Sequence, residues 1–131
     1  MDASKKTILL VDDDADYLFQ MKLKVEKFGF NVITADGQKE AEELLETTKP
    51  DLAIFDLMME NDDSGFILSY KTKKKYPDVP IIIATAVAAE TGISFGLETE
   101  AEKQWIKADL YLEKGIRADQ LHREIVKLLK M

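Results

Sequence analysis

Between positions 52 and 56 the chain reads Leu52-Ala53-Ile54-Phe55-Asp56, four apolar residues followed directly by an aspartate. A short, continuous apolar run of this kind is typical of a buried β-strand. Because an ionised carboxylate is costly to bury without partners, the aspartate should lie near solvent at the carboxyl end of that strand. The run therefore predicts a buried strand that carries Asp56 to one edge of a sheet.

Three further apolar runs lead into polar residues in the same manner. They are Ile8–Val11 before Asp12 and Asp13, Ile81–Ala84 before Thr85, and Leu110–Leu112 shortly before Lys114. If these strands are parallel neighbours, three carboxylates, a hydroxyl and an ammonium meet at one edge of one sheet. Open α/β sheets bind their ligands at that edge.

Helix-like segments separate these strands along the chain. After the first strand, Leu18, Met21 and Val25 recur at helical spacing, and similar stripes precede Pro50 and Pro77 and occupy the end of the chain. Strands that alternate with helices at this spacing favour right-handed crossovers and a parallel sheet. The expected strands are Thr7–Val11, Asn31–Ala35, Leu52–Asp56, Pro80–Thr85 and Asp109–Glu113, and a short helix is expected near Glu98–Lys107.

Size and composition favour one soluble domain. The 131 residues are enough for a single core, so residues 1–131 are expected to form one unit. The absence of cysteine excludes a disulfide and a thiolate metal site. A formal charge of -7, from 18 basic and 25 acidic residues, argues against general nucleic-acid binding. The longest apolar stretch, Val79–Ala89, is too short to span a bilayer, and no secretory signal is recognisable, so a cytoplasmic location is expected.

Together these features make the chain resemble the receiver domain of two-component response regulators, of the chemotaxis single-domain type. The resemblance covers essentially the whole chain, and its four features occur in the right order, each after a different expected strand. It implies a doubly wound, flavodoxin-like α/β fold, with a five-stranded parallel sheet in the order 2-1-3-4-5 and helices on both faces. The four features are Asp12-Asp13, Asp56, Thr85-Ala86 and Lys114.

The acids fit the requirements of phosphoryl transfer to a carboxylate. Because a carboxylate and a phosphoryl group repel each other, an aspartate that accepts phosphate needs a divalent cation. Mg²⁺, or Mn²⁺ in its place, prefers oxygen ligands such as carboxylates and water. Asp13 and Asp56 can supply the carboxylates and Asp12 can act through a water, while the resemblance adds the backbone carbonyl of Met58. Lys114 supplies a positive charge for a phosphoryl oxygen.

The resemblance also implies a function. Asp56 would accept a phosphoryl group from a sensor histidine kinase or a histidine phosphotransfer protein, with the Thr85 hydroxyl and the Ala86 amide as further ligands of the phosphoryl oxygens. Thr85 would then move, and Tyr111 would fill the vacated space from an outward position. The chain would catalyse only its own phosphorylation and slow dephosphorylation, so it is not expected to be an enzyme with an external substrate.

The downstream partner is expected to be a protein, with no direct contact to nucleic acid or membrane. The segment Ala86–Lys107, the strand Asp109–Glu113 and the last helix should form the binding face, because the segment directly follows Thr85. It also contains Gly92 and Gly96, and glycine lowers helix stability by roughly 1 kcal/mol.

Several features also have a purely structural interpretation, and two other functions stay open. Asp14 and Asp16 suit the start of a helix, where acids cap N–H groups and complement the dipole, and His122 is expected to be a surface residue of the last helix. A receiver-fold scaffold could act without phosphorylation. An aspartate-based phosphatase could use Asp56, although such enzymes need a second acid two places later, where Met58 stands.

Two departures from the family concern loop geometry. Gly115 follows Lys114 where the family usually has proline, and Glu60 stands where a proline usually follows Asp56. The family's bond at the first of these positions is commonly cis, but a cis bond before a residue other than proline costs roughly 2.5–4 kcal/mol. The Lys114–Gly115 bond is therefore expected to be trans, with Gly115 using its backbone freedom to turn the chain into the last helix.

Overall fold

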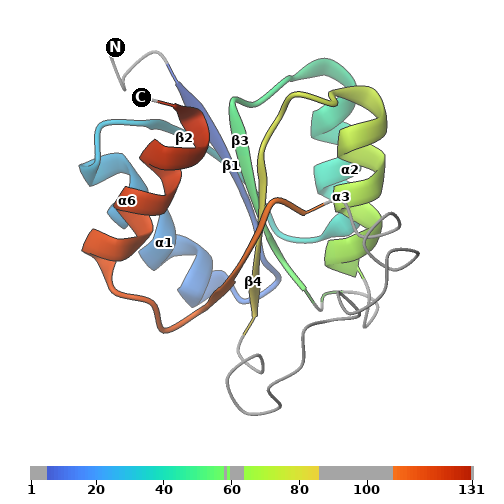
Figure 1. Ribbon diagram of the computed structural model, residues 1–131. Helices are drawn as coiled ribbons and strands as arrows, with labels where there is room; N and C mark the ends of the chain where they lie inside the picture. Colours follow the sequence, from blue (N-terminus) through green and yellow to red (C-terminus); the bar gives the residue numbers. More distant parts are fainter. Residues whose placement is uncertain (1–5, 58, 60–63, 86–107, 131) are drawn as a thin grey trace, which may run out of the picture.

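The expected five-stranded parallel sheet is present in the computed structural model, which describes residues 6–57, 59, 64–85 and 108–130 (Figure 1). The strands lie in the order β2-β1-β3-β4-β5 and every neighbouring pair is parallel, as the resemblance implied. The expected strand bounds agree with the observed ones to within one residue. The strands are β1 (Thr7–Val11), β2 (Asn31–Ala35), β3 (Leu52–Asp56), β4 (Ile81–Thr85) and β5 (Leu110–Glu113).

Two layers of helices cover the sheet. Helices α1 and α6 pack on one face, and α2 and α3 pack on the other (Figure 1). The short helix expected near Glu98–Lys107 lies outside the described residues. Within the described ranges, no helix combines the length and the apolar character needed to cross a bilayer. The helices are α1 (Ala15–Lys27), α2 (Gln38–Thr47), α3 (Ser64–Lys75) and α6 (Ala118–Leu129).

The central strands are buried on both faces, as their apolar sequences predict. Leu10 of β1 and Ile54 of β3 pack in the core beneath α1 and α6, whereas Val11 and Phe55 pack in the core beneath α2 and α3. Because side chains alternate along a strand, the residues two positions beyond Leu10 and Ile54 return to the side of α1 and α6. Those two residues are Asp12 and Asp56.

Strand β5 follows the same alternation. Leu110 and Leu112 pack against the core beneath α1 and α6, and Lys114 lies two positions beyond Leu112. The Lys114–Gly115 bond is trans as expected, since the described residues contain no cis peptide bond. The expectation about the Gly115 backbone is wrong, because its φ angle lies outside the left-handed region and an added Cβ would meet nothing within 4 Å. The turn into α6 therefore does not require glycine.

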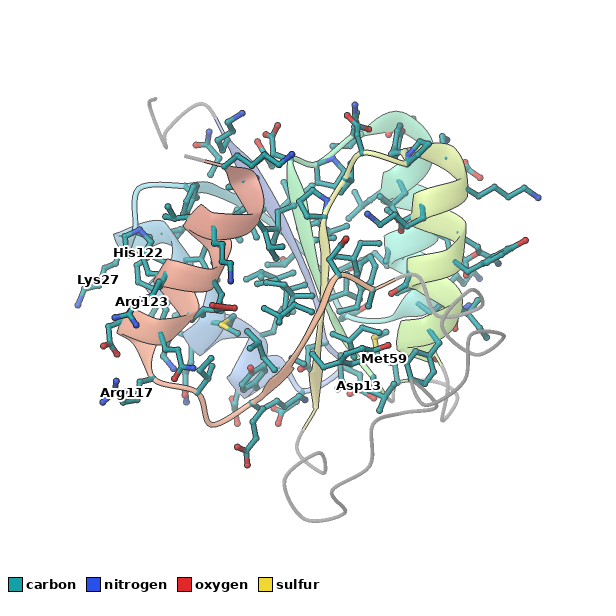
Figure 2. All side chains as sticks on the ribbon, viewed as in Figure 1. Asp13, Lys27, Met59, Arg117, His122 and Arg123 are labelled. Carbon is teal, nitrogen blue, oxygen red and sulfur yellow. The ribbon has the colours of Figure 1, made fainter. Side chains whose placement is uncertain are left out.

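His122 is a partly exposed residue of α6, and it also has aromatic partners that the sequence did not predict. Its ring stacks on Phe28, with centroids 4.3 Å apart and planes 6° apart, and it meets Phe30 edge-on at 6.3 Å. Figure 2 shows His122 on α6, on the side that faces α1. The histidine therefore helps to join these two helices, although its partners come from a distant part of the sequence.

Helix α3 approaches β3 closely at Gly65. The N–H of Gly65 donates to the Leu57 carbonyl at 2.8 Å. A Cβ added to Gly65 would lie 2.6 Å from the Asp56 carbonyl oxygen and 2.8 Å from the Leu57 Cα. Backbone atoms cannot rotate away as a side chain can, so a larger residue would have to push α3 outward or displace the end of β3.

The substitution Gly65→Ala should destabilise the protein by about 1–3 kcal/mol, the usual cost of overpacking a tight contact. Gly115→Ala is the matched control. Alanine fits the backbone and the open space at Gly115, so this change should be neutral or stabilising by about 0.4–1 kcal/mol. Urea unfolding followed by circular dichroism measures both effects, and equal stability of the two variants would contradict the close approach of α3 to β3.

Candidate functional site

Asp56 is the last residue of β3 and lies at the carboxyl edge of the sheet, between β1 and β4. It is in register with Ala84 of β4. Only 7% of the residue is exposed, so the carboxylate is covered more completely than a position near solvent would suggest. A carboxylate buried to this degree requires charged or hydrogen-bonding partners. The loops after β1 and β5 supply them.

The acids in the loop after β1 have different roles. Asp12 is 2% exposed, and its Oδ1 atom accepts a hydrogen bond from the Asp14 N–H at 2.9 Å. Asp14 caps α1, because its Oδ1 atom accepts from the N–H groups of Asp16 and Tyr17 at 3.1 and 3.2 Å. The capping role expected of Asp14 is confirmed. The cap anchors the loop that presents Asp12 and the exposed Asp13 to the site.

Three carboxylates gather at this edge. Asp12, Asp13 and Asp56 each offer an oxygen, and these oxygens lie within 4.8 Å of one another. Asp12 and Asp56 are buried and Asp13 is exposed, so the cluster is accessible from the Asp13 side. Figure 2 shows Asp13 at the end of the molecule where β4 terminates. Several carboxylate oxygens in one place are the ligands that Mg²⁺ takes in proteins, so the residues fit a hard divalent cation.

Lys114 connects two of these carboxylates. Its Nζ atom donates to Asp12 Oδ2 at 2.7 Å and to Asp56 Oδ1 at 3.1 Å. The Lys114 side chain is 20% exposed, so the ion pairs are largely shielded from water. Residues from the ends of β1, β3 and β5 therefore form one bridged charge cluster, as the sequence predicted.

Burial and charge shift the pKa values of this cluster. Burial, followed by the negative charge of Asp12, raises the pKa of Asp56 from 3.8 to about 6, against the opposing effect of Lys114. Burial alone would lower the pKa of Lys114, but the hydrogen bond to Asp12 and the charges of Asp56 and Asp12 outweigh it and raise that pKa. Lys114 therefore stays cationic at neutral pH, while Asp56 is mostly ionised but held in an unfavourable state.

Three of the predicted site residues are described only in part or not at all. Thr85 is the last residue of β4 and is in register with Glu113 of β5, but its side chain lies outside what the structure describes. Met58 and Ala86 lie outside the described residues. Their expected roles as a metal ligand and as phosphoryl ligands stay predictions.

Tyr111 is described, and its position differs from the expected outward one. The side chain is half-buried, its hydroxyl is inaccessible to solvent, and burial raises its pKa to about 12. The ring meets Phe66 of α3 edge-on, with centroids 6.3 Å apart. Tyr111 therefore already lies against the layer of α2 and α3, and the expected movement from an outward position does not apply to this conformation.

Sequence reasoning missed two residues of the site. The Tyr17 ring lies 4.6 Å from Lys114 Nζ, and Gly65 packs on the backbone of Asp56. Gly65 follows Ser64 at the expected start of a helix, which indicates a helix boundary and not a contact with Asp56. Tyr17 falls three residues after the capping Asp14, a position that places it near the loop. Its contact with Lys114 depends on how the chain after β5 meets the start of α1.

The comparisons with known proteins agree with this fold. The family model of the response regulator receiver domain matches residues 8–126, so the chain belongs to this family of two-component signalling domains. It is 30% identical to the alkaline phosphatase synthesis transcriptional regulatory protein PhoP of Bacillus subtilis over 125 residues, which are 95% of this chain and 49% of the relative. It is 32% identical to the phosphate regulon transcriptional regulatory protein PhoB of Pseudomonas aeruginosa over 127 residues, 95% of this chain and 50% of the relative. The chain thus spans about half the length of these relatives.

Solved structures with the same architecture match this chain over nearly the full length of both chains. A CheY-like response regulator receiver domain protein from Methanospirillum hungatei has a TM-score of 0.77 and 26% identity, with 95% of this chain and 94% of that chain covered. The response regulator protein TrrA from Thermotoga maritima, solved in complex with Mg²⁺ and BeF, has a TM-score of 0.76 and 26% identity, with coverages of 94% and 98%. The receiver fold of this chain is thereby established.

Removing the Asp56 charge should stabilise the metal-free protein in a pH-dependent manner. Because the folded protein raises the pKa of Asp56 from 3.8 to about 6, it binds this proton more tightly than the unfolded chain does. Wild type therefore loses stability as the pH rises from about 4 to about 6, whereas Asp56→Asn has no such proton to lose. The stability advantage of Asp56→Asn should grow by about 2 kcal/mol across this window.

Urea unfolding of both proteins at pH 4.5 and pH 7.5, with a chelator present, measures this difference. Groups that titrate alike in the two proteins cancel in the comparison. An advantage of Asp56→Asn that is the same at both pH values, or smaller at pH 7.5, would show that the fold does not disfavour the Asp56 anion.

Proposed function

We propose that this receiver domain is a phosphorylation-dependent signalling switch that accepts a phosphoryl group on Asp56 from a histidine kinase or a histidine phosphotransfer protein. The observation that carries the proposal is the placement of Asp56. Its carboxylate lies at the open edge of the sheet beside two further carboxylates and within 3.1 Å of the Lys114 ammonium. A nucleophile, a cation site and a positive charge for the phosphoryl oxygens are thus in one place.

The three carboxylates would hold Mg²⁺ or Mn²⁺, with the Met58 carbonyl as a further ligand by resemblance to the family. When bound, the cation supplies the charge neutralisation that lets a phosphoryl group approach an aspartate. Asp13 is exposed and so offers a route of entry to the buried Asp12 and Asp56. The Lys114 ammonium lies on Asp12 and Asp56 in this structure, so it has to shift when these oxygens take another partner.

In the proposed transfer, a carboxylate oxygen of Asp56 attacks the phosphorus atom of a phosphohistidine. The new P–O bond forms as the P–N bond breaks, and the imidazole leaves with its electron pair and takes a proton from solvent. Asp56 has to be ionised to attack, which a pKa of about 6 permits at neutral pH. Lys114 then pairs with a phosphoryl oxygen, and the Thr85 hydroxyl and Ala86 amide would donate to the others.

The transfer would change the contacts of Lys114, and that change is the proposed signal. Phosphorylation puts an additional negative charge on Asp56, which attracts Lys114 and weakens its pairing with Asp12. Tyr111 lies three residues before Lys114 on β5, so a shift of this strand end would reach its ring. We propose Thr85 and Tyr111 as the switch, and residues 86–107 with β5 and α6 as the face that binds a protein partner.

The other two functions have less support. A phosphatase of the aspartate type lacks its second acid at Met58, so we propose that the chain catalyses only its own phosphorylation and slow dephosphorylation. In a scaffold that acts without phosphorylation, the charge cluster would serve only to stabilise the fold. The raised pKa of Asp56 argues against that use, because the cluster makes the ionised aspartate unfavourable.

Acetyl phosphate with Mg²⁺ should add one phosphoryl group to the wild-type protein, seen by intact mass and labile to acid and base. Asp56→Asn should not be labelled, and a chelator should prevent labelling of wild type. Asp13→Ala should react much more slowly because it removes a proposed cation ligand. Asp16→Ala is the matched control, since Asp16 is an exposed acid of the first turn of α1 outside the cluster. Equal labelling of wild type and Asp56→Asn would refute the assignment.

Helix α1 offers a docking surface for the phosphoryl donor. A donor protein has to bring its phosphohistidine to the edge where α1 begins, and α1 exposes two large apolar side chains one turn apart. Phe19 is 59% exposed and Leu23 is 48% exposed. Apolar side chains at i and i+4 on one exposed helix face suit a packed helix of a partner. We propose that the donor covers Phe19 and Leu23.

The variants Phe19→Ser and Leu23→Ser should slow phosphoryl transfer from a phosphohistidine protein that labels wild type, by roughly tenfold or more if each contact is a central one. They should react normally with acetyl phosphate, which needs no docking. Tyr70→Ser is the matched control, because Tyr70 is also an exposed aromatic residue (42%) but lies on α3, on the other side of the sheet. Equal slowing by Tyr70→Ser, or no slowing by the α1 variants, would place the donor elsewhere.

A further inference from the structure

Tyr17 of α1 lies directly against the lysine of the site. The Lys114 Nζ atom is 4.6 Å from the centroid of the Tyr17 ring. Attraction between an ammonium and the face of an aromatic ring extends to about 6 Å, so this is a cation–π contact. The Tyr17 N–H donates to Asp14 Oδ1 at 3.2 Å, which anchors the backbone of the helix turn that carries the ring.

The hydroxyl group does not account for a tyrosine at this position. It is buried, and it has no hydrogen-bond partner among the described residues. Burial raises the pKa of Tyr17 to about 12, so the hydroxyl is not a proton carrier near neutral pH. A buried hydroxyl without a partner destabilises a fold, whereas the ring beside it makes a favourable contact. The ring is therefore the useful part of the residue.

The ring also fills the space beneath the charge cluster. The cavity among Tyr17, Asp12, Asp56 and the adjoining apolar side chains measures only about 10 Å³. A space of this volume has little room for a water molecule or for another side chain. The Tyr17 ring thus adjoins both this packed space and the Lys114 ammonium.

The partners of Lys114 differ in how they respond to the proposed reaction. Among the described residues, these partners are the carboxylates of Asp12 and Asp56 and the ring of Tyr17. In the proposed function, Asp12 binds a cation and Asp56 becomes an acyl phosphate. Both carboxylates therefore change their partners or their chemical form. The Tyr17 ring is neutral and undergoes neither change. It can hold the ammonium while the carboxylates exchange their partners.

We propose that Tyr17 is a positioning residue, whose ring keeps the Lys114 ammonium at the site during phosphoryl transfer to Asp56. A lysine has four rotatable bonds and about 2 kcal/mol of rotamer entropy, and Lys114 follows a strand end and precedes Gly115. Without the ring, Lys114 would leave the site more often once Asp12 and Asp56 no longer bind it. The role in transfer rests on the proposed function, whereas the ammonium–ring contact stands without it.

Two substitutions distinguish the effect of the aromatic ring from the effect of apolar volume alone. Tyr17→Phe keeps the ring and removes the unpartnered hydroxyl, and Tyr17→Leu keeps an apolar side chain and removes the ring. Val25→Ala controls for general weakening of α1, because Val25 is a fully buried residue of the same helix away from the cluster. Circular dichroism first establishes that each variant is folded.

The first measurement is the NMR signal of the Lys114 Cε–Hε group, without phosphodonor or divalent cation. A group above an aromatic face resonates upfield, so wild type, Tyr17→Phe and Val25→Ala should share an upfield-shifted signal. Tyr17→Leu should return the signal to the position of an exposed lysine. An unshifted wild-type signal, or one that Tyr17→Leu leaves in place, would overturn the ammonium–ring contact and with it the proposal.

The second measurement is the rate of phosphorylation by acetyl phosphate at saturating Mg²⁺. Tyr17→Leu should slow the reaction about fivefold, the factor that corresponds to a cation–π contact of moderate strength. Tyr17→Phe should restore the wild-type rate, and Val25→Ala should not reproduce the loss. An unchanged or faster rate in Tyr17→Leu would overturn the positioning role. If wild type takes up no phosphoryl group, the proposed function and the role in transfer fail together, while the NMR result still decides the contact.

Discussion

The Lys114 ammonium between Asp12 and Asp56 is the interaction on which the rest of the site depends. Both carboxylates are almost fully buried, and each would be strongly destabilising without a positive partner. Lys114 contacts both, at 2.7 and 3.1 Å, and so allows three charges to occupy one corner of the domain. The compensation is incomplete, because the pKa of Asp56 stays raised. The fold therefore maintains a carboxylate that further positive charge would stabilise.

Sheet topology brings these charges together. The acids and the lysine follow three different strands, β1, β3 and β5, and the crossover helices return every strand in the same direction. Parallel strands place all their carboxyl ends at one edge of the sheet, where open α/β sheets bind their ligands. The alternation of side chains then puts Asp12, Asp56 and Lys114 on the side of α1 and α6. Helix α1 lies on this side, where Asp14 caps its first turn and Tyr17 brings its ring to Lys114.

The site is packed closely around the backbone of Asp56 and loosely around the loop that follows Lys114. Gly65 lets α3 meet the backbone of Asp56 and Leu57, which holds the end of β3 in place. At Gly115, by contrast, nothing restricts a side chain, although Lys114 is its neighbour. The backbone of Asp56 is therefore confined more tightly than the loop after Lys114. This difference suits the proposed transfer, in which Lys114 changes partners while Asp56 stays in place.

The sequence alone determined the secondary structure, the parallel sheet and the residues of the charge cluster. Strand and helix periodicities report local backbone geometry, and an acid or lysine at the end of an apolar run is visible without a structure. The capping role of Asp14 was equally local. The carboxyl-edge cluster followed because parallel strands leave few other places for such residues. The strand order required the resemblance to a known family.

Only the tertiary structure decided the contacts between elements that are distant in the sequence. It showed Lys114 on both Asp12 and Asp56, the Tyr17 ring beneath it, and His122 stacked on Phe28. It also showed that Gly115 turns the chain without a left-handed backbone and that Tyr111 lies against Phe66. Periodicity assigns a residue to a face but not to a partner. The partner depends on how two helices are packed across a twisted sheet, which is a property of the whole fold.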